Sequence, residues 1–514
     1  LITWMGQELK KRRIRASAVD LSYLISLIGT DMEKILSELG KLAGYAAEKG
    51  FITREDIDLL ITPSVEIKIF RLTDHLGNLR PAAAYQAYQD LLRQNEKPEL
   101  MAQFDGFTYY PNTLSYGYHT NIAAPALFGG YDYTPEELEK HSDQLLAEKH
   151  NEALKMMPVN FLRSGYEVTV CDAPYANYQW IPDMSIYDDY PEIRTWNTIG
   201  FFDEYRRDIQ TWLEGKRNRN LFCYSLFRCA PTLLQPTLYD RGAYLETDAG
   251  EAGEEATELY GVSADFMNSY TVMQRLGDMT AVTDEGTDTF LMLTNEMTHN
   301  VIELQEPDYV PSRQVDNPAY EAEHSVRTSP DGRELNLATA SELVKIHYQG
   351  DMSAFLLLGK WFDELREAGV YDNTRIILVS DHGCYLGLFG VNLADREETL
   401  PEILGYATEQ WSDTMCYNPL LMVKDFGASG FMVDESFMTN ADTPSLAFEG
   451  TVENPANPFT GKPVTQEAKE AGEQRLVESA WDIMTNNGAF FTNPLWLTFR
   501  GKDIFDPENW SVGR

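Results

Sequence analysis

The sequence has few cysteines, and their spacing excludes two common kinds of cysteine site. The five are Cys171, Cys223, Cys229, Cys384 and Cys416. Their number is odd and no Cys-x-x-Cys pair occurs, which argues against a disulfide framework and against a thiolate zinc site. The sequence also has no run of about 18 uncharged apolar residues, so we expect no membrane-spanning helix.

The first residues, LITWMGQELKKRR, lack two features of a complete N-terminus. They include neither an initiating methionine nor the long apolar core of a signal peptide. We therefore expect them to be an internal stretch of a longer protein. No other targeting segment is predicted.

Positive charge is scarce, and the shortage is confined to one part of the chain. The formal net charge is −38, from 42 basic and 80 acidic residues. Residues 1–100 carry 14 of each sign, so the whole net charge lies in residues 101–514. An acidic surface of this kind is heavily solvated and repels a nucleic-acid backbone. The step in charge predicts a domain boundary near residue 100, and the length predicts more than one domain.

The first hundred residues predict an all-α segment. Thr30 and Glu33 form a capping box, and Gly50 ends the helix that follows. That helix carries one apolar stripe, which consists of Ile35, Leu36, Leu39, Leu42 and Ala43. No residue of this segment shows a pattern typical of a catalytic site.

Three phrases in this segment resemble the delta subunit of bacterial DNA polymerase III. They are LIGTDMEKILSELGKLAGYA, ITREDIDLLITPSVEIKIFRLTDHLG and LLRQNEKPE, in that order. The resemblance implies that residues 1–62 end a helical lid domain and that residues 63–100 begin a collar domain. It also implies a cytoplasmic setting and clamp-loader subunits as partners. The domain that opens the clamp in that family precedes these two and is not among these residues, so a clamp-loader fragment is one hypothesis.

Residues 101–514 change to alternating strands and helices. We predict one long helical stretch over 135–165, strands over 167–171, 287–294 and 375–379, and an amphipathic helix over 353–369. A helix followed by a turn and an apolar strand is typical of a mostly parallel sheet flanked by helices. The predicted fold class is therefore α/β, preceded by the all-α segment.

Asp381 and His382 follow directly after the apolar strand RIILV and its Ser380. In parallel α/β sheets, ligand-binding groups lie just past the carboxyl ends of the strands. Carboxylate oxygens and imidazole nitrogens are ligands of Zn²⁺, Mn²⁺ and related ions. The dipeptide alone is weak evidence for a metal site, because it fits a capping aspartate followed by a surface histidine better.

Five phrases in the second block resemble the alkaline phosphatase and sulfatase superfamily, in its lipoteichoic-acid-synthase-like branch. They are FTYYPNTLSYGYHTNIAAPALFGG, MLTNEMTH, VYDNTRIILVSDHG, YNPLLMVKDF and FMTNADTPSLA. Over residues 101–514 the resemblance implies a metal-dependent phosphoester hydrolase or a phosphoryl or phosphoglycerol transferase. It implies that Thr120 is the nucleophile and a metal ligand, that Asp381 and His382 bind the metal, and that His299 contacts the substrate.

Several alternatives stay open. The ion could be Mn²⁺, Zn²⁺ or Mg²⁺, because one Asp, one His and one Thr suit several ions. The substrate could be a phosphoester or a sulfate ester, on a lipid head group or a glycan. Thr113 and Ser115 are rival nucleophiles, and His119 is either a supporting group or a surface histidine. Cys229-Ala-Pro-Thr-Leu lacks the arginine of a sulfatase motif, which disfavours a sulfuric ester hydrolase, and we expect Cys229 to be a core or structural cysteine.

One expected part of this superfamily has no counterpart in the sequence. The first strand of its sheet ends in an acidic metal ligand, but here the block begins MAQFDGFTYY with no such strand. Asp105 follows no strand and lies too close to Thr120 to replace that acid. We therefore predict that the site is one ligand short and binds metal more weakly. Relatives of this block act outside the cytoplasmic membrane, which conflicts with the cytoplasmic setting of the first block, and we hypothesise that the chain is a chimera.

Overall fold

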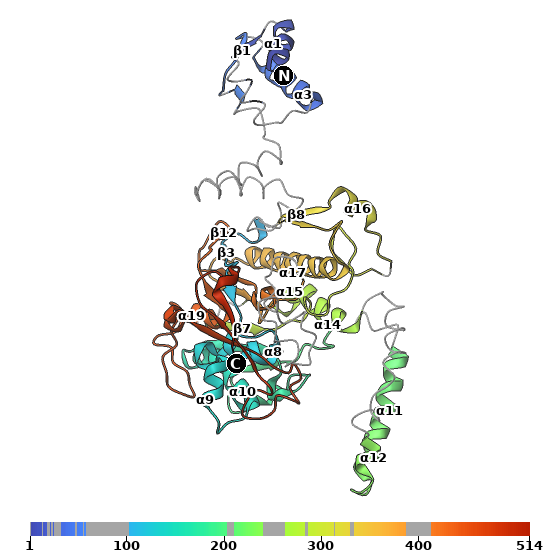
Figure 1. Ribbon diagram of the computed structural model, residues 1–514. Helices are drawn as coiled ribbons and strands as arrows, with labels where there is room; N and C mark the ends of the chain where they lie inside the picture. The colour runs from blue at the N-terminus through green and yellow to red at the C-terminus, as the bar shows by residue number, and fades with distance from the viewer. Residues whose placement is uncertain are drawn as a thin grey trace. The chain divides into compact units, whose positions relative to one another are not determined.

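The chain forms two compact units, residues 1–102 and residues 103–514, in a computed structural model (Figure 1). The structure describes residues 2–12, 14–17, 21, 24, 32–46, 49–54, 56–57, 102–202, 210–239, 263–282, 286–312, 314–328, 334–386 and 413–513. The predicted collar segment, residues 63–100, and Thr30 of the predicted capping box lie outside these ranges.

The first unit contains helices α1 (Ile2–Lys11) and α3 (Met32–Tyr45). Their inner faces bury one apolar cluster that includes four members of the predicted stripe, Ile35, Leu39, Leu42 and Ala43. The sequence did not reveal a short parallel pair between β1 (Arg15–Ala16) and β2 (Phe51–Ile52). Two residues a strand are too few to show an alternating pattern.

Two sheets of the second unit position the candidate site. In the first sheet the strands follow the order β10 (Ile376–Val379), β11 (Leu421–Lys424), β3 (Phe107–Tyr109) and β12 (Met432–Val433). Strand β11 runs antiparallel to both neighbours, while β12 and β3 are parallel. The second sheet is entirely parallel, in the order β6 (Arg194–Trp196), β5 (Glu167–Cys171) and β7 (Thr289–Leu293).

Three smaller sheets complete the strands of this unit. An antiparallel sheet contains β14 (Gln474–Glu478), β15 (Leu495–Phe499) and β16 (Trp510–Gly513). Strands β4 (Thr113–Leu114) and β13 (Met438–Thr439) form a parallel pair. Strands β8 (Val326–Thr328) and β9 (Glu334–Asn336) form an antiparallel pair.

Helices surround these sheets, which confirms the predicted α/β class. The described α-helices are α8 (Thr120–Gly129), α9 (Pro135–Lys140), α10 (Leu146–Arg163), α11 (Gln210–Cys229), α12 (Gln235–Tyr239), α14 (Ala264–Gln274), α15 (Leu276–Met279), α16 (Pro318–Glu323), α17 (Glu342–Glu367) and α19 (Thr443–Phe448). Short 3-10 turns connect them, at η1 (Gly130–Tyr133), η2 (Ala176–Tyr178), η3 (Met184–Tyr187), η7 (Thr414–Tyr417), η8 (Asn440–Asp442), η9 (Glu467–Ala471) and η10 (Pro507–Asn509).

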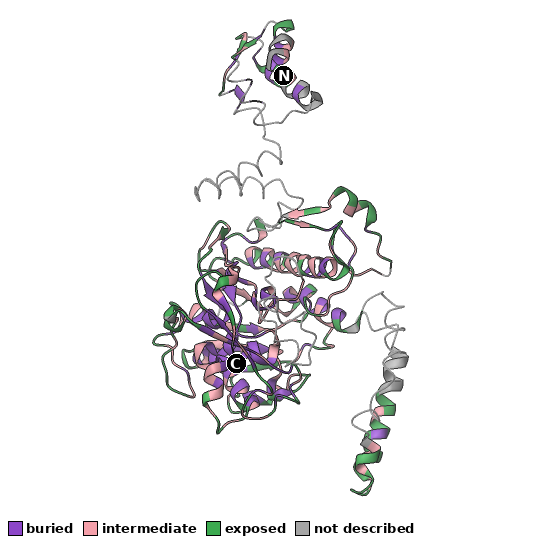
Figure 2. Ribbon diagram, viewed as in Figure 1, coloured by how far each residue is buried: buried purple, intermediate pink, exposed green. Residues whose placement is uncertain are grey.

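The core lies between the sheets and the helices on them, where Figure 2 shows the buried residues gathered. Helix α10 packs on β5 and β7, with Phe161 stacked on Phe290 at 4.1 Å between ring centroids. Helix α17 packs against β3, where Phe362 stacks on Phe107 at 5.4 Å. Apolar side chains therefore fix these two helices on the strands of the sheets.

Two expectations were wrong. The predicted long helix over 135–165 is broken, because α9 ends before His141 and the Glu148 carboxylate accepts the Leu145 backbone N–H, which starts α10 afresh. Cys229 is not a core cysteine, since it lies exposed at the end of α11.

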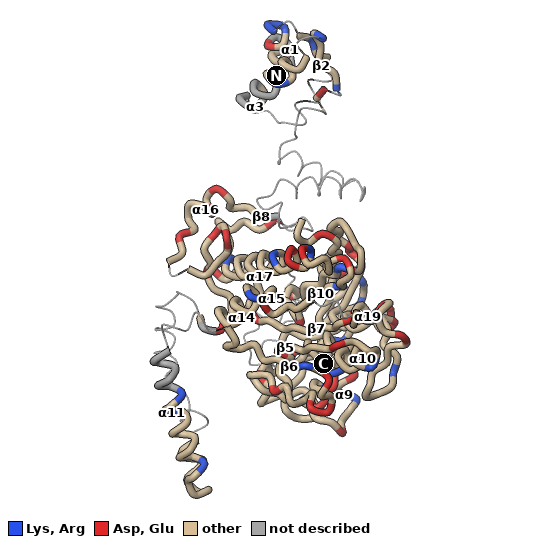
Figure 3. Tube along the Cα trace, turned by 180° about the vertical axis from the view of Figure 1, so that it is seen from behind, with Lys and Arg blue, Asp and Glu red and all other residues tan. Residues whose placement is uncertain are grey.

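Acidic residues are spread along the loops of the second unit (Figure 3). This spread agrees with a solvated acidic surface rather than with one concentrated patch. Within the described residues, none of the helices combines the length and the apolar character needed to cross a membrane.

His150 gives this unit a predictable pH dependence. The side chain is fully buried in α10, with Nε2 at 2.8 Å from the Pro174 carbonyl, and burial lowers its pKa from 6.5 to about 4. The unfolded chain therefore takes up a proton first as the pH falls. Stability that is intact above about pH 6.5 should decline towards pH 4, by about 3 kcal/mol in total.

Denaturant unfolding between pH 7 and pH 4 checks this expectation. His150→Gln retains a donor for the Pro174 carbonyl but does not titrate, so its stability should fall less than that of the unmodified protein. His141→Gln, at the end of α9, serves as the matched control. Equal pH slopes for His150→Gln and the unmodified protein would contradict the assignment.

Candidate active site

The loop after β10 is held in place by hydrogen bonds to one of its backbone carbonyl groups. The Asp381 carbonyl accepts two hydrogen bonds, from the Ser115 hydroxyl at 2.6 Å and from the Asn440 side-chain amide at 2.8 Å. Ser115 and Asn440 are fully buried. The loop therefore leaves the sheet in one fixed direction, with the Asp381 carboxylate partly exposed.

The geometry of Asp381 and His382 fits a shared cation. His382 Nδ1 lies 2.7 Å from the Gly383 carbonyl, which can only accept, so Nδ1 carries the proton and Nε2 presents its lone pair. Nε2 lies 3.5 Å from Asp381 Oδ2. Two ligands at zinc-like bond lengths in a tetrahedral site are about 3.4 Å apart. The two donors thus stand at the spacing that one ion needs.

Gly383 lets this loop pass close to the backbone of Met415 and Cys416. Its N–H donates to the Cys416 carbonyl at 2.9 Å. A Cβ added to Gly383 would lie 1.9 Å from the Met415 carbonyl oxygen, far inside van der Waals contact. The glycine of the Asp-His-Gly phrase is therefore required by a close backbone approach.

Residues 115–120 lie against this loop. The Tyr118 ring meets His382 edge to face at 5.5 Å, and the His119 ring lies 4.9 Å from Tyr118. Thr120 comes next, as the first residue of α8, and is partly exposed, whereas Asn121 through Gly129 are buried. The structure thus brings the segment that carries Thr120 beside His382, although about 260 residues separate them in the sequence.

The hydroxyl groups of the two rival nucleophiles, Thr113 and Ser115, are both engaged in hydrogen bonds to backbone carbonyls. Thr113 is buried and donates its hydroxyl to the Tyr110 carbonyl at 2.7 Å. Ser115 is buried and hydrogen-bonded to Asp381, as described above. His119 is not a free surface histidine, because its Nε2 lies 2.9 Å from a Glu478 oxygen at the end of β14.

His299 lies exposed in the turn after β7. The turn is fixed by buried Met297, whose N–H donates to Asn295 Oδ1 at 3.0 Å. The neighbouring Glu296 has a raised pKa, chiefly because the surrounding protein desolvates it, with Asp172 and Asp381 adding repulsion and His299 opposing the shift. The carboxylates that follow β5, β7 and β10 therefore influence one another electrostatically.

A second histidine near this edge was not identified from the sequence. His347 of α17 lies with Nε2 3.6 Å from the Cys384 sulfur, and both groups are partly buried. Burial lowers the pKa of His347, and the nearby His299 lowers it further. No local sequence pattern marks this contact, because 37 residues separate its partners.

The described residues contain no group of three or more His, Cys, Asp or Glu side chains arranged to hold a metal ion. The metal-ligand roles predicted for Asp381 and His382 therefore stay predictions. Asp105 is occupied elsewhere, since its carboxylate accepts the Gly430 N–H at 2.7 Å.

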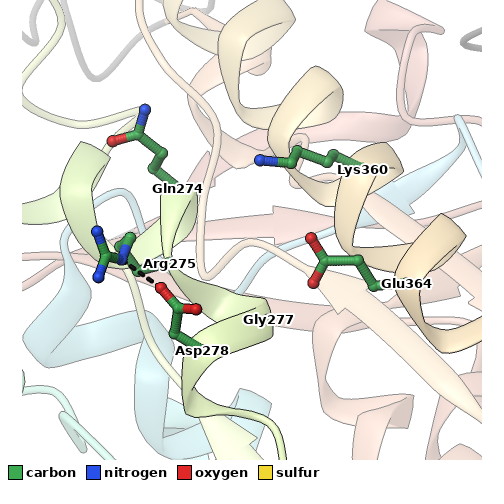
Figure 4. A pocket seen from close by; sticks show the side chains of 6 residues that line it. All are labelled: Gln274, Arg275, Gly277, Asp278, Lys360 and Glu364. Carbon is green, nitrogen blue, oxygen red and sulfur yellow. Dashed lines mark ion pairs between the residues drawn. The ribbon is translucent and has the colours of Figure 1, made fainter. Parts of the chain in front are cut away.

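An open pocket of about 350 Å³ lies away from the predicted site residues. Figure 4 shows Lys360 and Glu364 of α17 facing Arg275 and Asp278 across it, with Arg275 and Asp278 paired. Neither Thr120 nor any of the histidines lines this pocket, so we do not assign the chemistry to it.

No family model matches the chain. Over 76 residues, or 15% of the chain, it is 32% identical to DNA polymerase III subunit delta of Bacillus subtilis (strain 168), and it spans about a fifth (22%) of that protein's length. It is also similar to two solved structures: a phosphonate monoester hydrolase from Silicibacter pomeroyi and the lipoteichoic acid synthase LtaP from Listeria monocytogenes. For the first, the identity is 14%, the TM-score 0.38, and the match covers 79% of this chain and 81% of that one. For the second, the identity is 12%, the TM-score is 0.35, and the match covers 82% of this chain and 79% of that one. We draw no conclusion from structural likenesses at such TM-scores.

Gly383→Ala tests whether the loop depends on the close approach at Gly383. We expect the variant to lose about 1–3 kcal/mol of unfolding free energy, because the added methyl group displaces the Met415 carbonyl. Gly488→Ala is the matched control, since its Cβ would meet no atom closer than 3.8 Å. Denaturant unfolding of both variants is the measurement, and equal stability would overturn this reading of the loop.

Proposed function

We propose that residues 103–514 form a metal-dependent phosphoester hydrolase or a phosphoryl or phosphoglycerol transferase, with Thr120 as nucleophile. One observation carries the proposal. The segment from Ser115 to Thr120 packs on Asp381 and His382 through the Ser115 hydrogen bond and the Tyr118 ring. A partly exposed hydroxyl thus lies in the same region as two cation ligands at the right spacing for one ion.

The residues support attack on a phosphorus centre. Thr120 opens a ten-residue helix, and the positive end of the helix dipole there favours an anionic phosphate. In the first step the Thr120 oxygen forms a bond to phosphorus, the bond to the leaving alcohol breaks, and the hydroxyl proton goes to solvent. A divalent cation held by Asp381, His382 and the Thr120 oxygen would lower the pKa of that hydroxyl and offset charge on the phosphoryl oxygens.

The second step regenerates the threonine. Water attacks the phosphorus of the phospho-threonine and breaks its bond to the threonine oxygen, which releases a phosphate monoester from a diester substrate or phosphate from a monoester. If an acceptor alcohol attacks instead, it takes the same group and the enzyme acts as a transferase. His299 is the residue we assign to the leaving group or a substrate oxygen, because it is exposed in the turn that follows β7, three residues after Glu296, whose pKa Asp381 influences. Ser115 and Asn440 are positioning residues, since they hold Asp381 through its backbone carbonyl.

We assign no other activity. A sulfuric ester hydrolase would need the formylglycine motif, and Cys229 is exposed on α11 with no arginine four residues after it. The match to the polymerase delta subunit favours a shared origin for part of the chain. Because the match spans 22% of that protein, we propose no clamp-loader function from it.

Thr120→Ala tests the nucleophile. We expect metal-dependent hydrolysis of bis(p-nitrophenyl) phosphate by the full chain, and a loss of roughly 10³-fold or more in kcat in the variant. Thr120→Ser, which keeps a hydroxyl, should retain part of the rate. Thr237→Ala, at an exposed position of α12, is the control and should match the unmodified protein. A variant without the threonine that remains fully active would contradict the proposal.

Thermal unfolding with added Mn²⁺, Zn²⁺ or Mg²⁺ tests the cation site without turnover. At 100 times its dissociation constant, a bound ion should add about 2.7 kcal/mol of stability. Asp381→Asn and His382→Ala should remove this gain, whereas Asp105→Asn should keep it because Asp105 caps a distant turn. An equal metal-induced gain in stability in the unmodified protein and all three variants would show that the ion binds elsewhere.

A further inference from the structure

Helix α11 and the turn that follows it expose many large apolar side chains within a short stretch of chain. Phe222 of α11 is 68% exposed, and Leu233 of the turn before α12 is 89% exposed. Four more large apolar residues of this stretch are exposed, namely Leu221, Tyr224, Leu226 and Leu234. We call these six residues the apolar tip. Exposed apolar side chains gathered in this way mark an interaction site.

The turn between α11 and α12 has its own hydrogen bonds. The Gln235 side-chain amide donates to the Ala230 carbonyl at 3.1 Å, and the Leu234 N–H donates to the Pro231 carbonyl at 2.8 Å. Helix α12 also contacts α11. Leu233 is therefore exposed on a turn with a defined conformation.

The side chains of the apolar tip point in several directions around α11. With Leu221 as the reference, Phe222 lies about 100° around the helix and Leu226 about 140°. Tyr224 lies about 300° around it. A groove on a protein partner covers one side of a helix, whereas a lipid interface surrounds it. Apolar residues on all sides are typical of a helix in a core or in a membrane environment.

The charge of this stretch is opposite to that of its surroundings. Residues 217–239 include Arg217, Arg219 and Arg228 and no acidic residue, whereas residues 101–514 have a net charge of −38. Arg217 and Arg219 are exposed and precede the apolar tip by about one turn of the helix (Figure 3). Guanidinium groups at this border suit the phosphates of lipid head groups. The side chain of Arg228 is long enough to reach the same level from within the tip.

We propose that the apolar tip inserts into the surface of an anionic lipid bilayer, with Arg217 and Arg219 at the level of the lipid phosphates. From Leu221 to Cys229, α11 rises about 12 Å, which matches the depth of the boundary between head groups and acyl chains. Attachment of this kind combines buried apolar area with attraction to anionic lipids. The inference goes beyond the proposed reaction at Thr120 and does not depend on it.

Flotation of the full chain with lipid vesicles tests this inference. The vesicles contain equal parts of phosphatidylglycerol and phosphatidylcholine, or phosphatidylcholine alone. We expect binding to the mixed vesicles, and binding at least about tenfold weaker to phosphatidylcholine alone or at about 0.5 M salt. Phe222→Ser with Leu233→Ser should weaken binding at least about tenfold, and so should Arg217→Gln with Arg219→Gln.

Two double variants elsewhere in the chain are the matched controls. Trp481→Ser with Met484→Ser removes two apolar side chains that are 59% and 63% exposed outside α11 and α12. Arg163→Gln with Arg194→Gln removes two exposed positive charges. Both controls should bind the mixed vesicles as the unmodified protein does.

A fluorescent label on Cys229 reports insertion directly. Cys229 is exposed at the end of α11, and Cys384→Ser removes the half-buried cysteine that could also react. We expect the emission of a nitrobenzoxadiazole label to shift to the blue with the mixed vesicles, and lipids with brominated acyl chains to quench it.

Three results would overturn the inference. The first is no binding to the mixed vesicles, and the second is binding that the apolar-tip and arginine variants leave unchanged. The third is a dimer in the absence of lipid that Phe222→Ser with Leu233→Ser dissociates, because the apolar tip would then serve a second copy of the chain.

Discussion

The site depends on one buried hydrogen-bond junction at the Asp381 backbone carbonyl. Strands β4 and β13 run parallel, with Leu114 opposite Thr439, so the next residues of the two strands, Ser115 and Asn440, emerge side by side. Their side chains contact each other at 3.2 Å and both donate to the Asp381 carbonyl. In a dry environment each of these bonds costs about 1–3 kcal/mol to leave unmade. These hydrogen bonds therefore join three segments that lie far apart in the sequence, those around Ser115, Asp381 and Asn440.

Several carboxylates lie on the loops around this junction. The carboxylates of Asp172, Glu296 and Asp381 follow the ends of three strands. Desolvation raises the pKa of Glu296; His299 opposes this rise, and the nearby carboxylates add to it. In the proposed function, a divalent cation held by Asp381 and His382 would offset part of this negative charge.

The sequence indicated the elements with strong local patterns. Strand 167–171 was predicted with the bounds that the structure has, and the apolar RIILV strand leads into Asp381 and His382 as expected. The step in charge near residue 100 lies beside the division between the two compact units. The apolar periodicity did not predict the break in the helix over 135–165. The chain leaves the helix between His141 and Leu145, and the Glu148 carboxylate that accepts the Leu145 N–H sets where α10 begins.

Long-range partners could not be predicted in the same way. Glu478 lies about 360 residues from His119, Asn440 lies 325 residues from Ser115, and Trp481 lies about 300 residues from Trp180. Packing of the complete unit alone brings these pairs together. The roles of Thr120, Asp381, His382 and His299 remain predictions.

The most direct test of the account is to trap the covalent intermediate. The full chain, loaded with Mn²⁺ and turning over bis(p-nitrophenyl) phosphate, would be quenched in acid, digested and mapped by mass spectrometry. The account predicts a phosphoryl adduct on the peptide that contains Thr120, at that residue. An adduct on another residue, or turnover without any adduct on Thr120, would contradict it.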